Sequence, residues 1–382
     1  MIPEQTEVLV VGAGPVGLAV AASLAGQGRQ VTVVDRQAVG ANTSRAAVVH
    51  PRTLEMLEQI GVGDRLAGLG IHAKQFNIAD GDRTLVPVRF DKLPTAYPYV
   101  LMVPQSTTEQ VLLERLEELG GKVHRPYVAS GLRQTEEGAE VTLESGEVIK
   151  AQYVVAADGM HSKIRDLAGL GFSGDGTLPL NFTLADVRVE DGLPREEVLL
   201  YFSKAGILVA APLPDGSFRL VAKVDEAPEH PDVAYAQRLL NARGPRSRTA
   251  RVTEVIWGSR FRIHERVADR YREGRVVLAG DAAHTHSPAG GQGMNLGLRD
   301  AITLGEALAT ALTTGDETNL NNYATTSREE ALRVVALAHR LTRLATVPAP
   351  LRPARNAALH LLSHIPTFRS RFAHQLAAID HR

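Results

Sequence analysis

The stretch VLVVGAGPVGLAV (residues 8–20) decides the fold of this chain. Its first four residues are valine and leucine without a charge, which is typical of a strand buried on both faces of a parallel sheet. Glycines follow at positions 12, 14 and 17, ahead of small residues that let a helix lie close against the sheet. A second uncharged run, residues 31–34, ends at Asp35. The pattern predicts a βαβ unit and an α/β fold around a Rossmann-like sheet.

The three glycines predict a dinucleotide-binding turn. Gly12 permits the tight turn, Gly14 lets the backbone approach a pyrophosphate, and Gly17 allows close packing of helix on strand. Asp35, eighteen residues after Gly17, would accept hydrogen bonds from the adenosine ribose. The neighbouring residues Pro15, Val16 and Arg36 are assigned to the same site. NAD would fit these positions as well as FAD does.

A second stretch, GRVVLAGDAAHTHSPAGGQGMNLGLRDA (residues 274–301), decides between the two cofactors. A short buried strand ends at Asp281, whose carboxylate can bind the hydroxyls of a ribityl chain, a group that NAD lacks. The turn over residues 288–293 opens a helix at about Met294, and the N–H groups of that helix would face the pyrimidine end of a flavin. Its dipole would stabilise negative charge on N1/O2 of reduced flavin by about 0.3–1 kcal/mol. We therefore predict FAD, held here by Asp281, Gly291, Gly293, Met294 and Asn295.

Two histidines, His284 and His286, flank this turn. They could ligate a metal or take part in structural hydrogen bonds. No carboxylate accompanies them at helical spacing, so the pattern favours hydrogen bonding, and no metal site is assigned.

Composition excludes several other functions. The 382 residues are 44% hydrophobic and 22% charged, with a formal net charge of −1, which does not favour nucleic acid as a partner. There is no cysteine, which excludes disulfides, iron–sulfur clusters and a thiol relay. The uncharged run over residues 8–26 is long enough for a membrane span, but its four glycines and its proline favour strand, turn and helix. The acidic N-terminal flank lacks the basic region of a signal peptide, so a cytoplasmic protein is expected.

The chain divides into a cofactor domain, a substrate domain and a tail. We assign residues 1–75, 101–170 and 271–345 to the FAD-binding domain. Helices are expected there at residues 53–59, 110–118, 306–312 and 328–344, with a hairpin at 139–148. Residues 76–100 and 171–270 are assigned to an inserted antiparallel β-sheet that binds the substrate. Residues 346–382 form a basic C-terminal helical tail; a packed helix interrupted at Pro366 is favoured over one lying on a membrane surface.

Three motifs in this order resemble the fingerprints of the class A flavoprotein monooxygenases, the family of p-hydroxybenzoate hydroxylase and the aromatic polyketide hydroxylases. They are the glycine motif, Asp158-Gly159 in YVVAADGMHSKIR, and Gly280-Asp281 with PAGGQGMN. The resemblance covers residues 8 to about 344. Two segments, HSPAGGQGMNLGLRDA and SRAAVVHPRTLEML, are most similar in sequence to those of the branch that acts on phenols and polycyclic aromatic polyketides.

The resemblance implies roles for further residues. Arg45 and Ala46 would lie near the ribityl chain and pyrophosphate, on a hinge for a mobile flavin. Gln105 would contact the ribityl chain, although it could simply be a polar residue at a helix start, and Val128 would offer its backbone to adenine. Asp158 would serve both FAD and NAD(P)H. Pro288 would lie beside the isoalloxazine. His161 and Arg165 are candidates for the phosphates of NAD(P)H; His161 could instead be a solvated loop residue.

The implied activity is hydroxylation of an aromatic substrate with NAD(P)H and O2 through a flavin C4a-hydroperoxide. No side chain is assigned as a catalytic base, because the protein's part is orientation, exclusion of water and electrostatic support. Four aromatic residues could line the substrate cavity, with core packing as the alternative for each: Tyr97, Tyr99, Tyr201 and Phe202.

Alternatives of other classes remain open. A flavin enzyme of the same fold could perform Baeyer–Villiger oxygenation or inactivate an antibiotic, and a flavin-binding protein could lack turnover. Halogenation is disfavoured, because halogenases of this fold carry paired tryptophans and this chain has only Trp257. The larger polyketide hydroxylases continue into a thioredoxin-like domain. Here we expect a compact catalytic core, monomeric or homodimeric, without oligomerisation through such a domain.

Overall fold

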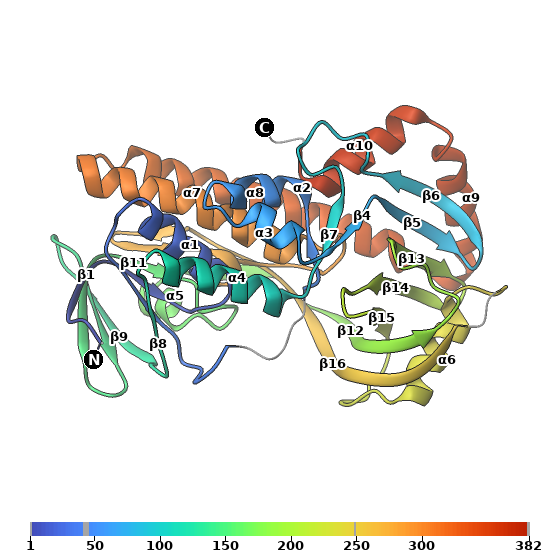
Figure 1. The fold of residues 1–382 in the computed structure, drawn as a ribbon, viewed down its shortest axis with the longest axis horizontal. Coiled ribbons are helices and arrows are strands. Elements are labelled where there is room, and N and C mark those ends of the chain that lie inside the picture. Colours follow the sequence, from blue (N-terminus) through green and yellow to red (C-terminus); the bar gives the residue numbers. More distant parts are fainter. Residues whose placement is uncertain (1, 41–45, 248–249, 380–382) are drawn as a thin grey trace.

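The computed structural model describes residues 2–40, 46–247 and 250–379, and the statements below refer to these residues. Two eight-stranded sheets lie one after the other along the long axis of the molecule (Figure 1). The long strands β12 (Phe172–Glu190) and β16 (Arg251–Ala268) lead from the region of the first sheet into the second.

The first sheet is a parallel core with helices on both faces. Its main strand order is β17-β18-β11-β1-β2-β8. Along β1, Val8 and Val10 pack in one hydrophobic cluster with α1 and α7, while Leu9 and Val11 pack in a second cluster on the opposite face. This two-sided burial explains why β1 has no charged residue in its second half. The strands are β1 (Gln5–Val11), β2 (Val31–Val34), β8 (Val123–His124), β9 (Ala129–Gln134), β10 (Ala139–Leu143), β11 (Val148–Ala156), β17 (Arg272–Glu273) and β18 (Val276–Leu278).

The second sheet has the order β19-β16-β12-β15-β14-β13-β5-β6. It is antiparallel, as expected, apart from one pair: β13 runs parallel to β5, because the β5–β6 hairpin comes from a chain segment about a hundred residues earlier. Helix α6 (Val233–Arg243) contributes Ala236 and Leu240 to the cluster on one face. The remaining strands are β5 (Gln75–Asp80), β6 (Arg83–Arg89), β13 (Glu197–Ser203), β14 (Gly206–Pro212), β15 (Phe218–Val224) and β19 (His284–Thr285).

A small third sheet connects the two large ones. Its order is β3-β7-β4, and its residues Val100 and Met102 pack in the same cluster as residues of the second sheet. The bounds here are β3 (Val48–Val49), β4 (Ile71–Ala73), β7 (Val100–Met102), α2 (Pro51–Glu58), α3 (Gly63–Ala67) and α4 (Gln105–Glu118). α4 begins five residues earlier than predicted.

The predicted helix at residues 306–312 is the later part of a much longer helix, α7 (Gln292–Thr314). The helix start expected at about Met294 belongs to the same helix; the sequence does not join the two parts, because Gly297 and Gly305 lower helix propensity. Both are packing positions: a Cβ on Gly305 would lie 2.3 Å from Ser23 Oγ of α1 (Pro15–Gly26). α7 therefore lies against α1, and α8 (Thr318–Ala345) returns alongside it (Figure 1).

The C-terminal tail packs against the second sheet as two helices, α9 (Arg352–Leu362) and α10 (Pro366–Ala377). Pro366 stands in the first turn of α10, where its missing N–H does no harm, so it starts a helix rather than interrupting one. Leu359, Ala373 and Leu376 join the cluster that contains β6 residues. The short helices are α5 (Lys163–Leu167) and two 3₁₀ turns, Gly280–Ala282 and Ala349–Leu351. Across the described ranges, no helix combines the length and apolarity needed to cross a bilayer.

Candidate cofactor site

Four parallel strands of the first sheet end at one edge, and each is followed by a residue that the sequence singles out. Gly12 follows β1, Asp35 follows β2, Asp158 follows β11 after one residue, and Asp281 follows β18 after two. Backbone hydrogen bonds hold this edge in register: Gly12 N donates to Val34 O at 2.8 Å and Ala279 N donates to Ala156 O at 3.0 Å. Carboxyl ends of parallel strands are where ligands bind in open α/β sheets.

The glycine turn has the shape that a pyrophosphate requires. Gly12 has φ +106°, and a Cβ on Gly17 would lie 1.9 Å from Gly12 O, so both glycines are required by the turn itself. A Cβ on Gly14, by contrast, would meet nothing within 4 Å. Gly14 is the N-cap of α1 without a side-chain cap, and Pro15 occupies the first turn. The bare helix N-terminus beside open space is an anion site.

Asp35 is tied to this turn. Its Oδ2 accepts the N–H of Ala13 at 2.7 Å and its Oδ1 accepts from Arg125 at 3.1 Å. Arg125 also donates to Ala13 O at 3.4 Å, so one guanidinium joins the end of β2 to the glycine turn. Arg125 has no local signal in the sequence, because its ion pair with Asp35 is long-range and arises only from the sheet order.

The next residues along this edge lie close by. Tyr127 N donates to the backbone oxygen of Asp35, the residue expected to bind the ribose, at 2.8 Å, and Val128 is the next residue after Tyr127. The backbone oxygen of Val128 accepts from Glu144 N. Arg36 is exposed, and Val16 packs against Gly280, where a Cβ would lie 2.8 Å from Val16 Cγ2.

Asp158 holds the loop that follows β11. Its Oδ2 accepts the N–H of Lys163 at 2.8 Å, while its Oδ1 is buried without a protein partner. Burial raises the pKa of this carboxyl. A buried oxygen with no partner indicates a ligand or an ordered water at this position.

Arg165 does not lie where the sequence placed it. Its side chain is only 5% exposed, and its Nη1 donates to the backbone oxygens of Met160 and Ala282 at 3.1 and 3.2 Å. Its guanidinium also lies 4.0 Å from the centroid of the Phe172 ring. The expected contact with NAD(P)H phosphates needs an accessible guanidinium, so this geometry argues against it; Arg165 joins the Asp158 loop to the Asp281 turn.

His161 is exposed, which suits both a contact with NAD(P)H phosphates and a solvated loop residue. It contributes to a cationic surface with residues of β16: Arg266, His161 and Arg262, after burial, lower the pKa of His264. Since β16 belongs to the second sheet, this surface lies where the two sheets meet.

The flavin turn before α7 is fixed to the segment that precedes α2. Asn295 is fully buried; its Oδ1 accepts His50 N at 2.7 Å, and its Nδ2 donates to Val48 O and Gly291 O at 2.9 and 2.7 Å. His50 Nε2 lies 2.9 Å from Gly290 O, and burial lowers the pKa of His50 to about 4. The Asn295 side chain thus places the turn, and a contact of Asn295 with the cofactor would be made by its backbone N–H.

The turn leaves the start of α7 open. Gly291 is the N-cap with φ 65°, and no side chain caps the helix. Pro288 and Asp281 are exposed, and Gly293 and Met294 are half-buried. The helix N–H groups are therefore available to a negatively charged ligand atom.

The two histidines of this motif are structural. His284 Nε2 lies 2.7 Å from Asp300 Oδ2, with both side chains buried, so a carboxylate of α7 pairs with the histidine across 16 residues. His286 Nδ1 lies 2.8 Å from Ser287 O, and burial lowers the pKa of His286 to about 4. Within the described part of the chain, no group of three or more potential metal ligands occurs.

Ala46 is held from both sheets. Its N–H donates to Gln105 Oε1 at 3.3 Å, and its carbonyl accepts from Gln105 N at 3.0 Å. From the second sheet, Arg219 Nη1 donates to the same carbonyl at 3.0 Å. Arg219 is 4% exposed and makes a bidentate ion pair with Asp186, at 2.8 and 2.7 Å. Arg45, the neighbour of Ala46, lies outside the described residues.

The four aromatic residues considered for the substrate cavity pack in hydrophobic clusters. Tyr97 and Tyr99 belong to the first-sheet core, where Tyr97 donates to Asp64 and Tyr99 stacks on His72 with centroids 3.8 Å apart. Tyr201 and Phe202 are each 2% exposed. Three half-buried residues are better candidates than these four for the wall of a substrate cavity. They lie side by side on neighbouring strands, on the sheet face that carries Arg219, and are Leu200, Val209 and Val221.

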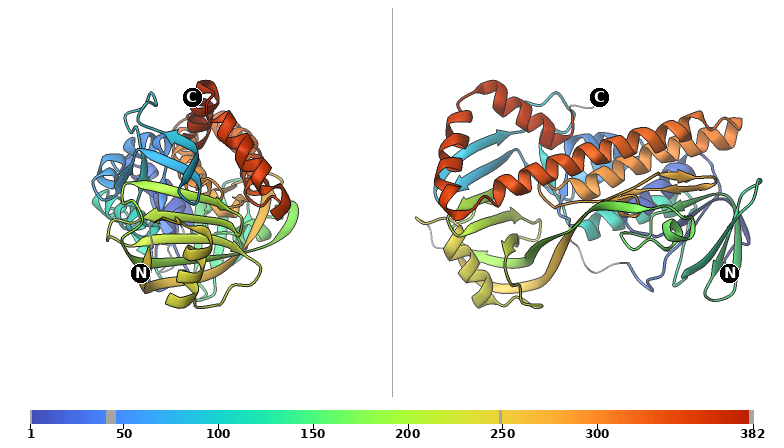
Figure 2. Two further views of the ribbon diagram at one scale, coloured as in Figure 1. Left: turned by 90° about the vertical axis from the view of Figure 1, so that its right-hand side faces the viewer. Right: turned by 180° about the vertical axis from the view of Figure 1, so that it is seen from behind.

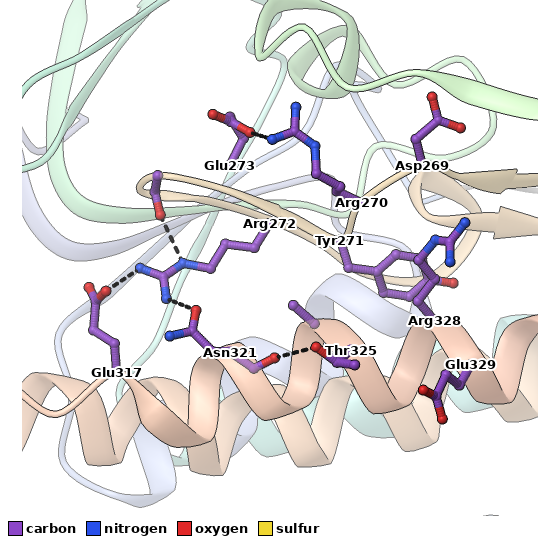
Figure 3. Close-up of a pocket in the computed structure, with 12 residues that line it drawn as sticks. Asp269, Arg270, Tyr271, Arg272, Glu273, Glu317, Asn321, Thr325, Arg328 and Glu329 are labelled. Carbon is purple, nitrogen blue, oxygen red and sulfur yellow. Dashed lines mark hydrogen bonds and ion pairs between the residues drawn. The ribbon is translucent and has the colours of Figure 1, made fainter.

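A surface groove lies elsewhere, between the β17 turn and α8 (Figure 3). It measures about 520 Å³, and its charged residues pair among themselves, as Arg272 does with Glu317 and Arg270 with Glu273. None of the strand-end residues above lines it, so we do not assign the cofactor to it.

The residues at the strand ends fit FAD. Open space before Gly14, an unpartnered oxygen on Asp158, and two uncapped helix starts offer places for a pyrophosphate, for hydroxyls and for an anionic ring edge. They lie at one sheet edge, as a single extended ligand requires.

Comparison with known proteins gives the same picture. Residues 5–338 match the family model described as an FAD binding domain. The chain is similar to 6-methylpretetramide 4-monooxygenase of Streptomyces rimosus, with 35% identity over 97% of this chain and 68% of that protein. It is 38% identical to rifampicin monooxygenase of Streptomyces venezuelae over 79% of this chain and 64% of that protein. The structure resembles p-nitrophenol 4-monooxygenase of Pseudomonas putida DLL-E4, with a TM-score of 0.84 and 25% identity, covering 99% of this chain and 98% of the other.

Proposed function

The chain belongs to the FAD-dependent aromatic monooxygenases, and we propose that it hydroxylates a phenolic or polycyclic aromatic substrate with NAD(P)H and O2. The observation that carries the proposal is the row of strand ends. The glycine turn, Asp158 and Asp281 lie together at one edge of the first sheet. This edge faces the segment of Ala46, whose carbonyl accepts a hydrogen bond from Arg219 of the second sheet.

FAD would extend along this edge. The glycine turn would take its pyrophosphate and Asp35 its adenosine ribose, with Asp281 on the ribityl chain and the start of α7 at the pyrimidine ring. When bound and reduced by NAD(P)H, the flavin supplies the activation of O2 and the transfer of one oxygen atom to the ring.

The substrate would lie between the flavin turn and the second sheet. Leu200, Val209 and Val221 offer an apolar wall on the sheet face from which Arg219 reaches Ala46. An aromatic ring gains from apolar burial and is oriented by shape, and the closed site excludes water. We assign no general base; the chain's residues bind, orient and exclude solvent.

NAD(P)H would approach at the surface that carries Arg262 and Arg266, beside His161. Cations there complement the phosphates of the reductant. We place the protein in the cytoplasm, where reduced nicotinamide cofactors are available. The similarity to rifampicin monooxygenase favours one second candidate, oxidative inactivation of an aromatic antibiotic at the same site.

The first test is spectroscopic. Purified protein should show a flavin absorption band, and NAD(P)H oxidation should rise with a phenolic substrate and give a hydroxylated product by mass spectrometry. Asp281→Ala should weaken FAD binding at least tenfold in a titration of apoprotein, while Asp91→Ala, an exposed carboxylate on the second sheet's hairpin, should not. A protein that takes up no FAD would refute the assignment; FAD uptake with only peroxide release from every phenol tested would refute hydroxylation alone.

A further inference from the structure

Glu265 is a buried carboxylate that uses only one of its two oxygens. It lies on β16, next to the residues that pair with β19, and its side chain is 4% exposed. Its Oε2 lies 2.9 Å from Nδ1 of His339 on α8, while Oε1 is buried and has no hydrogen-bond partner among the described residues. A buried carboxylate that serves only to hold a structure together ordinarily has partners for both oxygens, because an unpartnered one costs stability.

His286 has a ring nitrogen in the same condition. Its Nδ1 lies 2.8 Å from Ser287 O, and since a carbonyl only accepts, Nδ1 carries the proton. Nε2 is then an acceptor, and it is buried without a partner in the part of the chain that the structure describes. The contact with Ser287 therefore accounts for one nitrogen of the imidazole and leaves the other able to take up a proton.

The two unpartnered atoms belong to neighbours across a strand pair. β16 and β19 are antiparallel, with Val267 opposite His284, so two residues further along the same register Glu265 stands opposite His286. The rings of His284 and His286 lie 6.5 Å apart, as alternate residues on one face of an extended chain do. Opposite residues have Cβ atoms about 4.5–5.5 Å apart. One ordered water can bridge two acceptors at this separation by donating to both.

The three side chains reach from solvent to the flavin turn. At the outer end, His339 is 34% exposed on α8, which runs lengthwise above β16 when the molecule is seen from behind (Figure 2). At the inner end, His286 is partly exposed beside the first turn of α7, where a Cβ on Gly293 would lie 4.0 Å from its Nε2. That turn is the place proposed above for the pyrimidine ring of the flavin.

The neighbouring pair of His284 and Asp300 gives no such connection. Its side chains are 0% and 3% exposed, and Tyr271, whose ring stacks on His284, is 1% exposed. These groups face His286 from the interior, and none of them reaches solvent. The only one of these neighbouring titratable side chains that is open to water is His339.

The proposed reaction needs a proton at this place. NAD(P)H, O2, one proton and an aromatic C–H give NAD(P)+, water and the hydroxylated ring; O2 takes up two electrons from the nicotinamide and two from the C–H bond. The proton comes from solvent in every turnover, although the site has to exclude water while oxygen is transferred. Titratable side chains in series allow a proton to enter a site that is closed to bulk water.

We propose that His339, Glu265 and His286 form a proton path from solvent to the pyrimidine end of the flavin, with an ordered water between Glu265 Oε1 and His286 Nε2. His339 takes up a proton at Nε2 and releases the one on Nδ1 to Glu265 Oε2. The carboxyl group turns and passes a proton through the water to His286 Nε2. Burial lowers the pKa of His286 to about 4, so this proton is given up readily. The use of the proton rests on the proposed function; the arrangement of the path does not.

The arrangement can be tested without turnover. A crystal structure of the FAD-loaded protein should show one water within hydrogen-bond distance of both Glu265 Oε1 and His286 Nε2. Nitrogen NMR of histidine-labelled protein should show His286 protonated on Nδ1, and Glu265→Gln should shift its Nε2 signal. The matched control is Glu330→Gln, which changes another carboxylate of α8, paired with the buried Arg299 of α7, and should leave that signal in place. No bridging water, or a proton on Nε2, would overturn the path.

The transport of protons is tested during turnover with a phenol that the protein hydroxylates. Glu265→Gln keeps the size of the side chain and a contact with His339 but cannot release a proton. We expect product formation to slow at least about tenfold, with a larger solvent deuterium isotope effect and unchanged FAD affinity. Glu330→Gln should change neither the rate nor the isotope effect. A purely structural Glu265 would alter stability or FAD affinity and leave the isotope effect as it is, which would refute the proposal.

The outer end has a test of its own. His339→Gln should slow product formation less than Glu265→Gln, because water can reach Glu265, and added imidazole should restore the rate. The control His364→Gln, which removes an exposed histidine beyond α9, should neither slow the reaction nor respond to imidazole. Equal rates with and without imidazole in His339→Gln would contradict the path. A protein that hydroxylates no phenol would refute the proposed function alone, because the water and the NMR signals test the arrangement independently.

Discussion

At the scale of single residues, the three glycines of the first turn have different surroundings and therefore different tasks. Gly17 has no space for a side chain, because a Cβ would lie 1.9 Å from a backbone oxygen. Gly14 has space on all sides in the protein itself. Only a bound pyrophosphate would give Gly14 a reason to lack a side chain.

Substitution separates these tasks. Gly14→Ala should fold with almost unchanged stability but bind FAD at least tenfold more weakly, because the new methyl group occupies the space of the ligand. Gly17→Ala should lose about 3 kcal/mol of stability, since the backbone must move to admit the methyl group. Denaturation of the apoproteins and FAD titration by fluorescence measure the two effects. Equal FAD affinity of Gly14→Ala and the unchanged protein would show that the pyrophosphate lies elsewhere.

At the scale of secondary-structure elements, the flavin turn is positioned by its neighbours. α7 begins in an uncapped glycine, and the turn before it is held by His50, at the N-terminus of α2, and by Asn295 in the first turn of α7. His50 is 3% exposed and accepts no proton readily, because burial lowers its pKa to about 4.

This burial makes the stability depend on pH. An unfolded histidine has a pKa of about 6.5, so between about pH 6.5 and 4 the unfolded state binds more protons than the native state, and stability falls as the pH is lowered. We expect the unfolding free energy of the holoenzyme to drop between about pH 7 and 5, with His50 contributing on the order of 2 kcal/mol. His50→Gln, which retains a donor for Gly290 O, should flatten this slope, whereas the exposed control His364→Gln should not. Identical slopes in all three proteins would contradict the role given to His50.

At the scale of the whole molecule, one buried arginine of the second sheet reaches the segment beside the cofactor edge. Arg219 of β15 is held by Asp186 of β12 and reaches Ala46, which α4 holds from the other side through Gln105. If the substrate binds to the second sheet as proposed, the contact of Arg219 with Ala46 would couple substrate binding to the cofactor edge.

Loss of this link should uncouple the reaction. Arg219→Met leaves the Asp186 carboxylate buried and unpaired, and we expect a loss of stability of about 3 kcal/mol or more together with a larger share of NAD(P)H oxidation ending in peroxide. Arg188→Met, which removes an exposed arginine of β12 paired with Glu254, should change neither quantity. Product yield per NAD(P)H consumed is the measurement. An unchanged yield in Arg219→Met would place the coupling outside this pair.

Those features of the fold that depend on neighbouring residues can be predicted from the amino-acid sequence. The uncharged strand, the glycine spacing and the acid at the next strand end predict the βαβ unit, and the second stretch predicts the helix start at the flavin turn. Their chemistry follows from local rules of backbone geometry and burial, so Gly12, Gly14, Gly17 and the strand ends could be identified without a structure.

The tertiary structure decided what depends on pairing across long separations. The inward direction of Arg165, the use of the Asn295 side chain for backbone contacts, and the partners Arg125 and Arg219 leave no periodic pattern in the sequence. The role of a polar residue depends on its neighbours in the folded protein, and the sequence does not distinguish a buried arginine from an exposed one. The sequence therefore identified the cofactor and its edge of the sheet, and the packing of distant segments decided which side chains face that edge and which hold it in place.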